Sequence, residues 1–272
     1  MTALKIENPP ETRPVPNKDL RRRIVDMVIK GRNGHIPSAF SILDIVTVMY
    51  RNVLKVDPLK PDWSERDIFV LSKGHGCLAL YVNLHRAGFL SDGDLDGFCK
   101  KGGILGEHPD ATKVPGVEAS TGSLGHGICY ALGIALGLRI QGRNNRVFVL
   151  VGDGECHEGT IWEAAHVAPN LRLGSMCVVV DWNQSGMQLL PHDDLPAKWR
   201  AFGWNTLVVD GHNESNLRAA FESLNDSGGE VPTVIIARTV KGKGVPLLEG
   251  HGPWHHRIPN EQEYAEIMEV LA

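Results

Sequence analysis

Short apolar runs rich in Val alternate along the chain with longer segments of mixed polarity. The runs that we predict to be strands end in Gly, Asn, Asp, Ser or Arg and cover residues 66–72, 146–152, 178–183, 205–210 and 233–238. The two runs at residues 146–152 and 178–183 are rich in Val and typical of strands that are buried on both faces of a parallel sheet, because a strand with one wet face would alternate polar and apolar positions. We therefore expect a parallel sheet that is covered on both sides.

Helices are predicted between these runs, so that strands and helices alternate along most of the chain. The segments expected to be helical are residues 20–30, 42–54, 77–87, 130–138, 158–168, 214–225 and 261–271. Residues 90–116 should be irregular around a short helix, because Gly102, Gly103 and Pro109 break regular structure. The fold class is therefore α/β, a doubly wound, mostly parallel sheet flanked by helices. We divide the chain into a Pro-rich N-terminal extension, residues 1–17, and one domain, residues 18–272.

Polar residues follow two of the predicted strands at the points where the strands end. Gly152-Asp153-Gly154 ends one run and Asn183 ends the next. Ligands of open α/β sheets bind beyond the carboxyl ends of the strands, and Asp and Asn supply the hard oxygen ligands that Mg²⁺ or Ca²⁺ takes. The two glycines permit close approach of the backbone to a ligand. The pattern indicates a cofactor with a diphosphate and a divalent cation; the alternative is an ordinary Gly-rich turn after a core strand.

Composition and charge narrow the possible functions. The 272-residue chain is 42% hydrophobic with a formal net charge of −4, and it has no long basic stretch, so nucleic-acid binding is not expected. Its longest apolar stretch, residues 130–138, is too short to span a bilayer, and the N-terminus lacks the apolar core of a signal peptide. Five cysteines without a Cys-x-x-Cys pair indicate reduced thiols, and we predict a cytoplasmic protein.

Several motifs together carry a resemblance to a known family. Gly152 through Asn183 resembles the thiamine diphosphate fingerprint, and its surroundings from about residue 20 to 259 resemble transketolase. Six matches in the family's order are specific, although each alone would be weak. The other matching segments are Gly34-His35-Ile36-Pro37, Ser72-Lys73-Gly74-His75-Gly76, His108-Pro109, Ser120 through Gly127, and Gly252-Pro253-Trp254-His255.

The resemblance implies thiamine diphosphate with Mg²⁺ or Ca²⁺ as cofactors. It implies cofactor-binding positions at His75, Gly122, Ser123, Leu124, Gly154, Glu155, Asn183 and His255. The implied cation ligands are Asp153, Asn183 and the backbone carbonyl of Ser185.

The implied reaction transfers a two-carbon ketol unit from a ketose or ketose phosphate to an aldehyde, with the cofactor as electron sink. Such a reaction needs groups that exchange protons near neutral pH, which suits histidine. The resemblance places His35, His108 and His255 as the catalytic histidines, the first two holding the hydroxyls and carbonyl of the donor. Each could instead be a structural histidine, which is the interpretation that we give to His85, His166, His192 and His212.

The length of the chain predicts a partner. A full transketolase resembles this chain followed by a pyrimidine-binding domain and a C-terminal domain, so the chain looks like the N-terminal subunit of a split transketolase. The resemblance implies a C-terminal subunit that supplies those domains and the glutamate that activates the aminopyrimidine. It also places Glu158 and Glu163 toward that subunit. We expect a heterotetramer with two copies of each chain, and no activity of this chain alone.

Two other functions remain open from the sequence. One is an E1 alpha-like subunit of a 2-oxoacid dehydrogenase, and the other is a non-catalytic module that binds thiamine diphosphate. Within the transketolase interpretation, four residues differ from the usual pattern near the expected cleft, namely Ile36, Glu107, His126 and His256. These differences leave open a specialised transfer, for instance to an unusual sugar or a carrier-bound acceptor.

Overall fold

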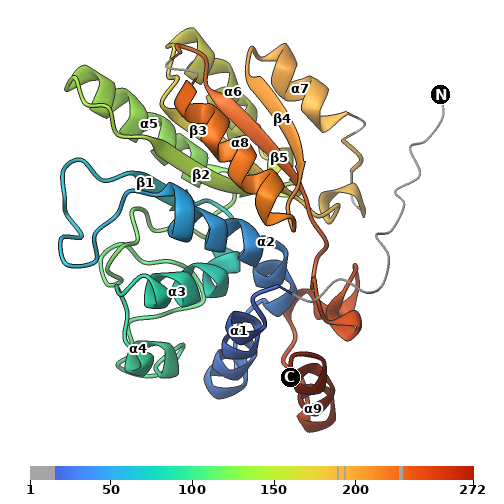
Figure 1. The fold of residues 1–272 in the computed structure, drawn as a ribbon. Coiled ribbons are helices and arrows are strands. Elements are labelled where there is room, and N and C mark those ends of the chain that lie inside the picture. Colours follow the sequence, from blue (N-terminus) through green and yellow to red (C-terminus); the bar gives the residue numbers. More distant parts are fainter. Residues whose placement is uncertain (1–15, 189, 193, 227–228) are drawn as a thin grey trace.

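A five-stranded sheet, parallel throughout, forms the centre of the molecule, with helices on both faces (Figure 1). The computed structural model describes residues 16–188, 190–192, 194–226 and 229–272. The strand order is β1-β2-β3-β5-β4, so the connection from β3 to β4 passes over the position of β5. The predicted α/β fold with a parallel, doubly wound sheet is confirmed. The strands are β1 Ile68–Leu71, β2 Val147–Gly152, β3 Met176–Trp182, β4 Asn205–Asp210 and β5 Thr233–Arg238.

Apart from α7 (Leu195–Ala201), the helices follow the strands as the alternating pattern predicts. Short 3-10 turns, Gly74–Gly76, Glu155–His157, Gly186–Gln188, Pro246–Leu248 and Pro253–His256, lie in the connections. The α-helices are α1 Lys18–Gly31, α2 Ile36–Val48, α3 Cys77–Arg86, α4 Asp92–Asp96, α5 His126–Ile140, α6 Gly159–Asn170, α7 Leu195–Ala201, α8 Glu214–Asp226 and α9 Glu261–Val270.

Two hydrophobic cores cover the two faces of the sheet, because successive side chains of a strand point to opposite faces. In β2, Phe148 and Leu150 join the core formed with α1, α2, α3 and α8. Val147, Val149 and Val151 join the other core, formed with α5, α6 and α7. All six residues of β2 are buried, which explains why the strand reads as a continuous apolar run.

The second helix begins earlier than predicted, at Ile36 instead of residue 42, and gives way after Val48 to a π-helical turn at Met49–Val53. Pro37 occupies the first turn, where its fixed φ and missing N–H are tolerated. Every residue of α2 is buried, so no polar face marks where the helix starts. The short helix α7 was not predicted; the Asp194 side chain accepts a hydrogen bond from the N–H of Ala197 and caps it.

The N-terminal extension lies almost entirely outside the described residues, and its division from the domain stays a prediction. Asn17, at the start of the described part, donates to Asp44 at 2.8 Å. Among the described residues, the helices are all too short or too polar to cross a membrane.

Candidate functional site

The predicted site residues gather at one edge of the sheet. The strands are parallel, so their carboxyl ends meet there, and ligands of open α/β sheets bind at that edge. Segments after four neighbouring strands contribute: residues 72–75 after β1, 153–155 after β2, 183–185 after β3 and 239–241 after β5.

Asp153 is the buried carboxylate of the predicted cation site. Its Oδ1 accepts the N–H of Gly154 at 2.8 Å, and its Oδ2 accepts the N–H of Gly186 at 3.3 Å. Burial, followed by the nearby Asp181, raises the pKa of Asp153 to about 6. A Cβ on Gly186 would lie 2.8 Å from Cα of Gly154, so glycine is needed there. The close approach brings the loop after β3 against the loop after β2.

Asn183 is oriented by Asp181, a residue that the sequence motifs do not single out. Asn183 Nδ2 donates to Asp181 Oδ2 at 2.7 Å, while Asn183 Oδ1 accepts the N–H of Ser185 at 3.0 Å. Asp181 also accepts hydrogen bonds from Ser41 at 2.8 Å and from Lys73 at 2.6 Å. Although burial opposes ionisation, the Lys73 ammonium lowers the pKa of Asp181, which therefore stays charged. The amide oxygen of Asn183 consequently faces the loop that carries Ser185.

These residues fit a divalent cation. Asp153 and Asn183 are both buried and offer hard oxygen donors of the type that Mg²⁺ and Ca²⁺ prefer. Two carboxylates, Asp153 and Asp181, are buried close enough for one to raise the pKa of the other. A bound cation would compensate the second negative charge, as Lys73 compensates the first.

Glu155 has a positioning role in the structure. Its Oε1 accepts the N–H of Gly125 at 2.8 Å and the hydroxyl of Ser72, and its Oε2 accepts the N–H of Gly152 at 3.0 Å. Burial raises the pKa of this carboxyl group, and the three donors oppose that shift. Glu155 thus joins the end of β2 to the segment before α5.

Three of the predicted histidines form a cluster, although they come from distant segments. The ring centroids of His35 and His75 are 5.3 Å apart, those of His35 and His255 are 5.3 Å apart, and those of His75 and His255 are 5.9 Å apart. Burial, followed by the surrounding imidazoles and Lys73, lowers the pKa of His35 to about 3. Burial also lowers the pKa of His75 and His255. At neutral pH the cluster therefore consists of neutral imidazoles, each with one donor and one acceptor.

His108 lies against the segment that precedes α5. A Cβ on Gly122 would come 3.0 Å from Cδ2 of His108, and a Cβ on Gly74 would come 2.9 Å from the backbone N of Gly122. Tyr81 Oη lies 3.0 Å from the carbonyl oxygen of His108 and donates to it. The structure thus brings together His108, Gly122 and the loop after β1. Ser123 is exposed and Leu124 is half-buried on the same segment.

Sequence reasoning missed four residues around the predicted site, namely Asp181, described above, and Lys73, Lys241 and His192. Lys73 stands within the Ser72–Gly76 motif, where only the histidine was expected to act. Lys241 Nζ lies 2.9 Å from Nδ1 of His255. His192, which we interpreted as structural, has Nε2 2.8 Å from the carbonyl oxygen of Asp153 and so holds the backbone of the cation site. The only signal for Asp181 and Lys73 was a charged residue within or directly after a buried strand.

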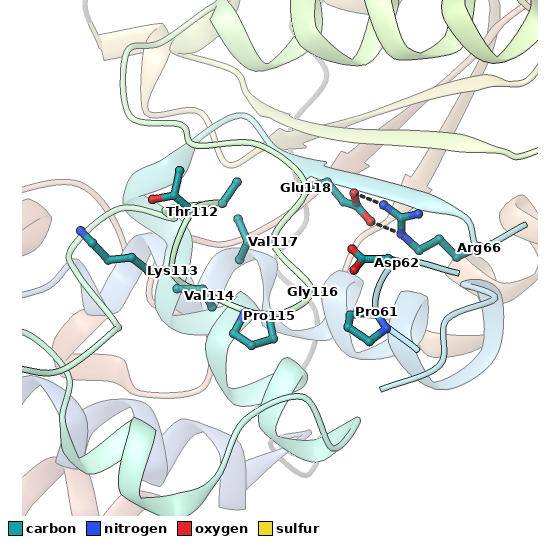
Figure 2. Close-up of a pocket in the computed structure, with 11 residues that line it drawn as sticks. Pro61, Asp62, Arg66, Thr112, Lys113, Val114, Pro115, Gly116, Val117 and Glu118 are labelled. Carbon is teal, nitrogen blue, oxygen red and sulfur yellow. Dashed lines mark hydrogen bonds and ion pairs between the residues drawn. The ribbon is translucent and has the colours of Figure 1, made fainter. Parts of the chain in front are cut away.

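A surface pocket of about 290 Å³ lies elsewhere, between residues 61–66 and 111–118 (Figure 2). Arg66 forms a two-pronged ion pair with Glu118 at its rim, with distances of 2.8 and 2.7 Å. None of the predicted site residues lines this pocket. Arg66 and Glu118 are already paired with each other, and we assign this pocket no part in the chemistry.

Comparison with known proteins identifies the family. Residues 17–271 match the family described as transketolase, thiamine diphosphate binding domain. The chain is 36% identical over 267 residues to one of the subunits of the apulose-4-phosphate transketolase of Phocaeicola vulgatus, covering 96% of this chain and 94% of that protein. It is 35% identical over 257 residues to the 6-deoxy-6-sulfo-D-fructose transketolase subunit SqwG of a Clostridium species, covering 92% of this chain and 93% of that protein.

Solved structures agree with the sequence matches. The transketolase from Leishmania mexicana superposes with a TM-score of 0.86 at 30% identity, over 93% of this chain and 40% of that one. The transketolase from Campylobacter jejuni gives a TM-score of 0.86 at 29% identity, over 93% of this chain and 41% of that one. The chain thus spans about 40% of these solved transketolases. The predicted resemblance to transketolase is confirmed, and these matches favour a transketolase subunit over a subunit of a 2-oxoacid dehydrogenase. The chain belongs to the transketolase family, as a thiamine diphosphate-binding N-terminal subunit of a transketolase-type transferase.

Proposed function

We propose that this chain, together with a C-terminal subunit, transfers a two-carbon ketol unit from a ketose or ketose phosphate to an aldehyde or a specialised acceptor. The observation that carries the proposal is the placement of a buried oxygen-ligand site, Asp153 with Asn183, at the same sheet edge as the neutral cluster His35, His75 and His255. The oxygen-ligand site suits a cation and a diphosphate, and the histidine cluster suits proton exchange with a sugar.

Thiamine diphosphate, when bound, supplies the electron sink for breaking and forming a carbon–carbon bond. We assign the cation, Mg²⁺ or Ca²⁺, to Asp153, Asn183 and the backbone carbonyl of Ser185. The diphosphate is assigned to His75, His255 and the backbone near Gly154, and the aminopyrimidine to Gly122, Ser123 and Leu124. The close packing of Gly74 on Gly122 supports this, because it draws the segment before α5 toward the loop that carries His75.

The histidines of this chain bind the substrate and move protons. We assign His35 and His108 to the hydroxyls and carbonyl of the donor, and His255 to the reacting carbonyl. The low pKa of His35, about 3, keeps this imidazole neutral, so it can accept a proton from a hydroxyl or donate one in a hydrogen bond. His255 contacts Lys241, whose pKa is lowered by burial and then by Lys73, and this contact fixes the orientation of the imidazole.

An apolar surface on α5 and α6 supports the presence of a partner chain. Tyr130 is 51% exposed, Ile140 is 76% exposed and Val167 is 37% exposed. On α5, a Cβ on Gly133 or Gly137 would meet no atom within 4 Å, so the helix presents a smooth face. Large exposed apolar residues that cluster on one face mark interaction surfaces. We assign this face, with Glu158 and Glu163 nearby, to contacts in a heterotetramer with two copies of each chain.

Binding of the cofactor is the first test. Isothermal titration of thiamine diphosphate with Mg²⁺ into the full chain should give a measurable affinity, and Asp153→Ala should reduce it by at least about 10-fold, since a cation ligand is lost. Asp210→Ala removes an exposed carboxylate at the end of β4 and serves as the matched control. An unchanged affinity of Asp153→Ala would mean that the cation site is misassigned.

Turnover tests the division into subunits. The purified chain with cofactor and Mg²⁺ should show no ketol transfer, and activity should appear on adding a chain that carries a pyrimidine-binding domain. Because two relatives are named for unusual sugars, apulose 4-phosphate and 6-deoxy-6-sulfo-D-fructose, these are the first donors to assay. Turnover by this chain alone would contradict the split arrangement, and oxidation of pyruvate by the reconstituted pair would favour the dehydrogenase alternative.

A further inference from the structure

Two residues that differ from the usual transketolase pattern, Glu107 and His256, meet at His35. Glu107 Oε1 lies 3.0 Å from Nε2 of His256 and 3.4 Å from Nδ1 of His35. The ring centroids of His35 and His256 are 4.5 Å apart. Two imidazoles and one carboxylate therefore converge, and one donor atom from each of the three residues lies within 4.8 Å of the other two.

We propose that His35, Glu107 and His256 form a second metal site, specific for a transition-metal ion such as Zn²⁺. The donor set distinguishes it from the site at Asp153 and Asn183. Imidazole nitrogens suit Zn²⁺ and similar ions, whereas Mg²⁺ and Ca²⁺ prefer oxygen ligands. A Zn²⁺ ion bound by two histidines and one glutamate, with water at the fourth position, is an established arrangement in proteins.

The spacing of the donor atoms suits such an ion. Zn²⁺ binds imidazole nitrogen and carboxylate oxygen at about 2.0 to 2.2 Å, so donors at tetrahedral angles lie roughly 3.3 Å apart. The two nitrogen–oxygen separations, 3.0 and 3.4 Å, bracket this value. The His256 side chain is 53% exposed, so its ring is free to rotate and to adjust the separation between the two imidazole nitrogens.

An unsatisfied atom of His35 points to the same place. Within the described part of the chain, Nδ1 of His35 is buried and has no well-aligned hydrogen-bond partner, although the Glu107 oxygen is near. A buried nitrogen without a partner is costly, and a bound cation between nitrogen and carboxylate would satisfy both atoms. Binding requires the lone pair of each imidazole nitrogen, so the proton that His256 carries on Nε2 would move to Nδ1, on an exposed ring.

Asn33 orients the carboxylate of this cluster. Asn33 Nδ2 donates to Glu107 Oε2 at 3.1 Å, which leaves Oε1 directed at the two imidazoles. Asn33 Oδ1 lies 2.9 Å from Nε2 of His256 and also accepts the N–H of Gly34 at 2.9 Å. The bond to Glu107 Oε2 is an outer partner of the kind that sets the direction of a metal ligand, whereas the contact between His256 Nε2 and Asn33 Oδ1 would be replaced by the bond to the ion. The cluster is therefore organised by the protein around Glu107 Oε1.

The test is a zinc titration of the metal-free full chain in saturating Mg²⁺, with a chromogenic zinc chelator as competitor. We expect one equivalent of Zn²⁺. Glu107→Gln and His256→Gln should each weaken binding by at least about 100-fold, because losing even an outer partner of a metal ligand typically costs roughly 10- to 100-fold. Both residues are partly exposed, so unchanged thermal unfolding will show that the variants fold. X-ray absorption of the zinc complex should show two imidazole ligands.

Two control variants separate this site from incidental binding. His166→Gln removes an exposed histidine on α6, and Cys129→Ser removes an exposed thiol on α5; both should keep the affinity of the unsubstituted chain. Equal affinity in Glu107→Gln and His256→Gln, or loss of binding in Cys129→Ser, would overturn the proposal. The readout is binding, so it is independent of whether the proposed ketol transfer is correct.

Discussion

Lys73 and Asp181 form a buried ion pair that joins the loop after β1 to strand β3. Lys73 Nζ lies 2.6 Å from Asp181 Oδ2, and the side chains are 2% and 0% exposed. The same carboxylate oxygen accepts the hydrogen bond from Asn183. The pair therefore links the fold of the sheet edge to the direction of the predicted cation ligand.

Removing the lysine should destabilise the chain strongly. Lys73→Met leaves Asp181 charged and without its cation in the interior, which typically costs roughly 3 to 5 kcal/mol. Urea unfolding measures the free energy of unfolding. Lys73→Met combined with Asp181→Asn should recover part of the loss. Lys113→Met, which removes an exposed ion pair with Asp110, should change the stability by less than about 1 kcal/mol. Equal effects of the two lysine variants would contradict a structural role of the buried pair.

Asp153→Asn should have opposite effects without and with a cation. The raised pKa of Asp153, about 6 against an ordinary 3.8, means that its charge destabilises the metal-free fold at neutral pH. Removing that charge should raise the free energy of unfolding by up to about 3 kcal/mol, since one pKa unit corresponds to about 1.4 kcal/mol. Thermal unfolding with and without Mg²⁺ and thiamine diphosphate tests this. The variant should lose the stabilisation by ligand, and a ligand response like that of the unsubstituted chain would disprove the assignment.

Buried neutral histidines predict loss of stability in acid. The unfolded chain takes up protons on His35 and His75 below about pH 6.5, whereas the folded chain does not, because burial lowers both pKa values. The contribution of these histidines to the free energy of unfolding is fully present above pH 6.5 and decreases as pH falls. Each histidine contributes a slope of up to about 1.4 kcal/mol per pH unit. For His35 the decrease continues down to about pH 3. Asp153 and Glu155 have the opposite effect: their pKa values are raised in the folded chain, so their protonation stabilises the fold as pH falls.

Comparing variants isolates the histidine contribution. In urea unfolding between pH 7 and 4, His75→Gln should flatten the loss of stability, since the proton uptake by the unfolded state disappears at this position. His166→Gln, at an exposed site, should leave the slope unchanged. A slope for His75→Gln that equals that of the unsubstituted chain would exclude His75 as a source of acid sensitivity.

A charge on α5 should block assembly. Tyr130→Asp places a carboxylate on the apolar face of α5 while leaving the core intact, because the side chain is 51% exposed. Light scattering after co-expression with the C-terminal subunit should then show separate chains in place of a heterotetramer. Leu59→Asp, at an apolar residue that is 89% exposed in the connection before β1, is the control and should still assemble. Assembly of both variants would place the interface elsewhere.

Much of the fold could be predicted from the sequence, because most of its helices and strands are determined by local sequence patterns. The runs at 205–210 and 233–238 became β4 and β5 with the same bounds, since their ends coincide with polar residues and glycine. The start of α2 was not readable, because a helix that is buried all round has no periodic pattern. The short α7 was missed for a related reason, since seven residues give too little periodicity to detect.

The sequence by itself determined the parallel α/β fold, the family and the residue types of the site, because apolar runs and spaced motifs are local in the chain. Only the tertiary structure decided which side chains share a site. Asp181 and Lys73 are 108 positions apart, and His256 and Asn33 are 223 apart. Such pairs form when strand ends and loops converge at one sheet edge. The pKa shifts of Asp153 and His35 likewise arise from burial and neighbouring charges, which exist only after folding.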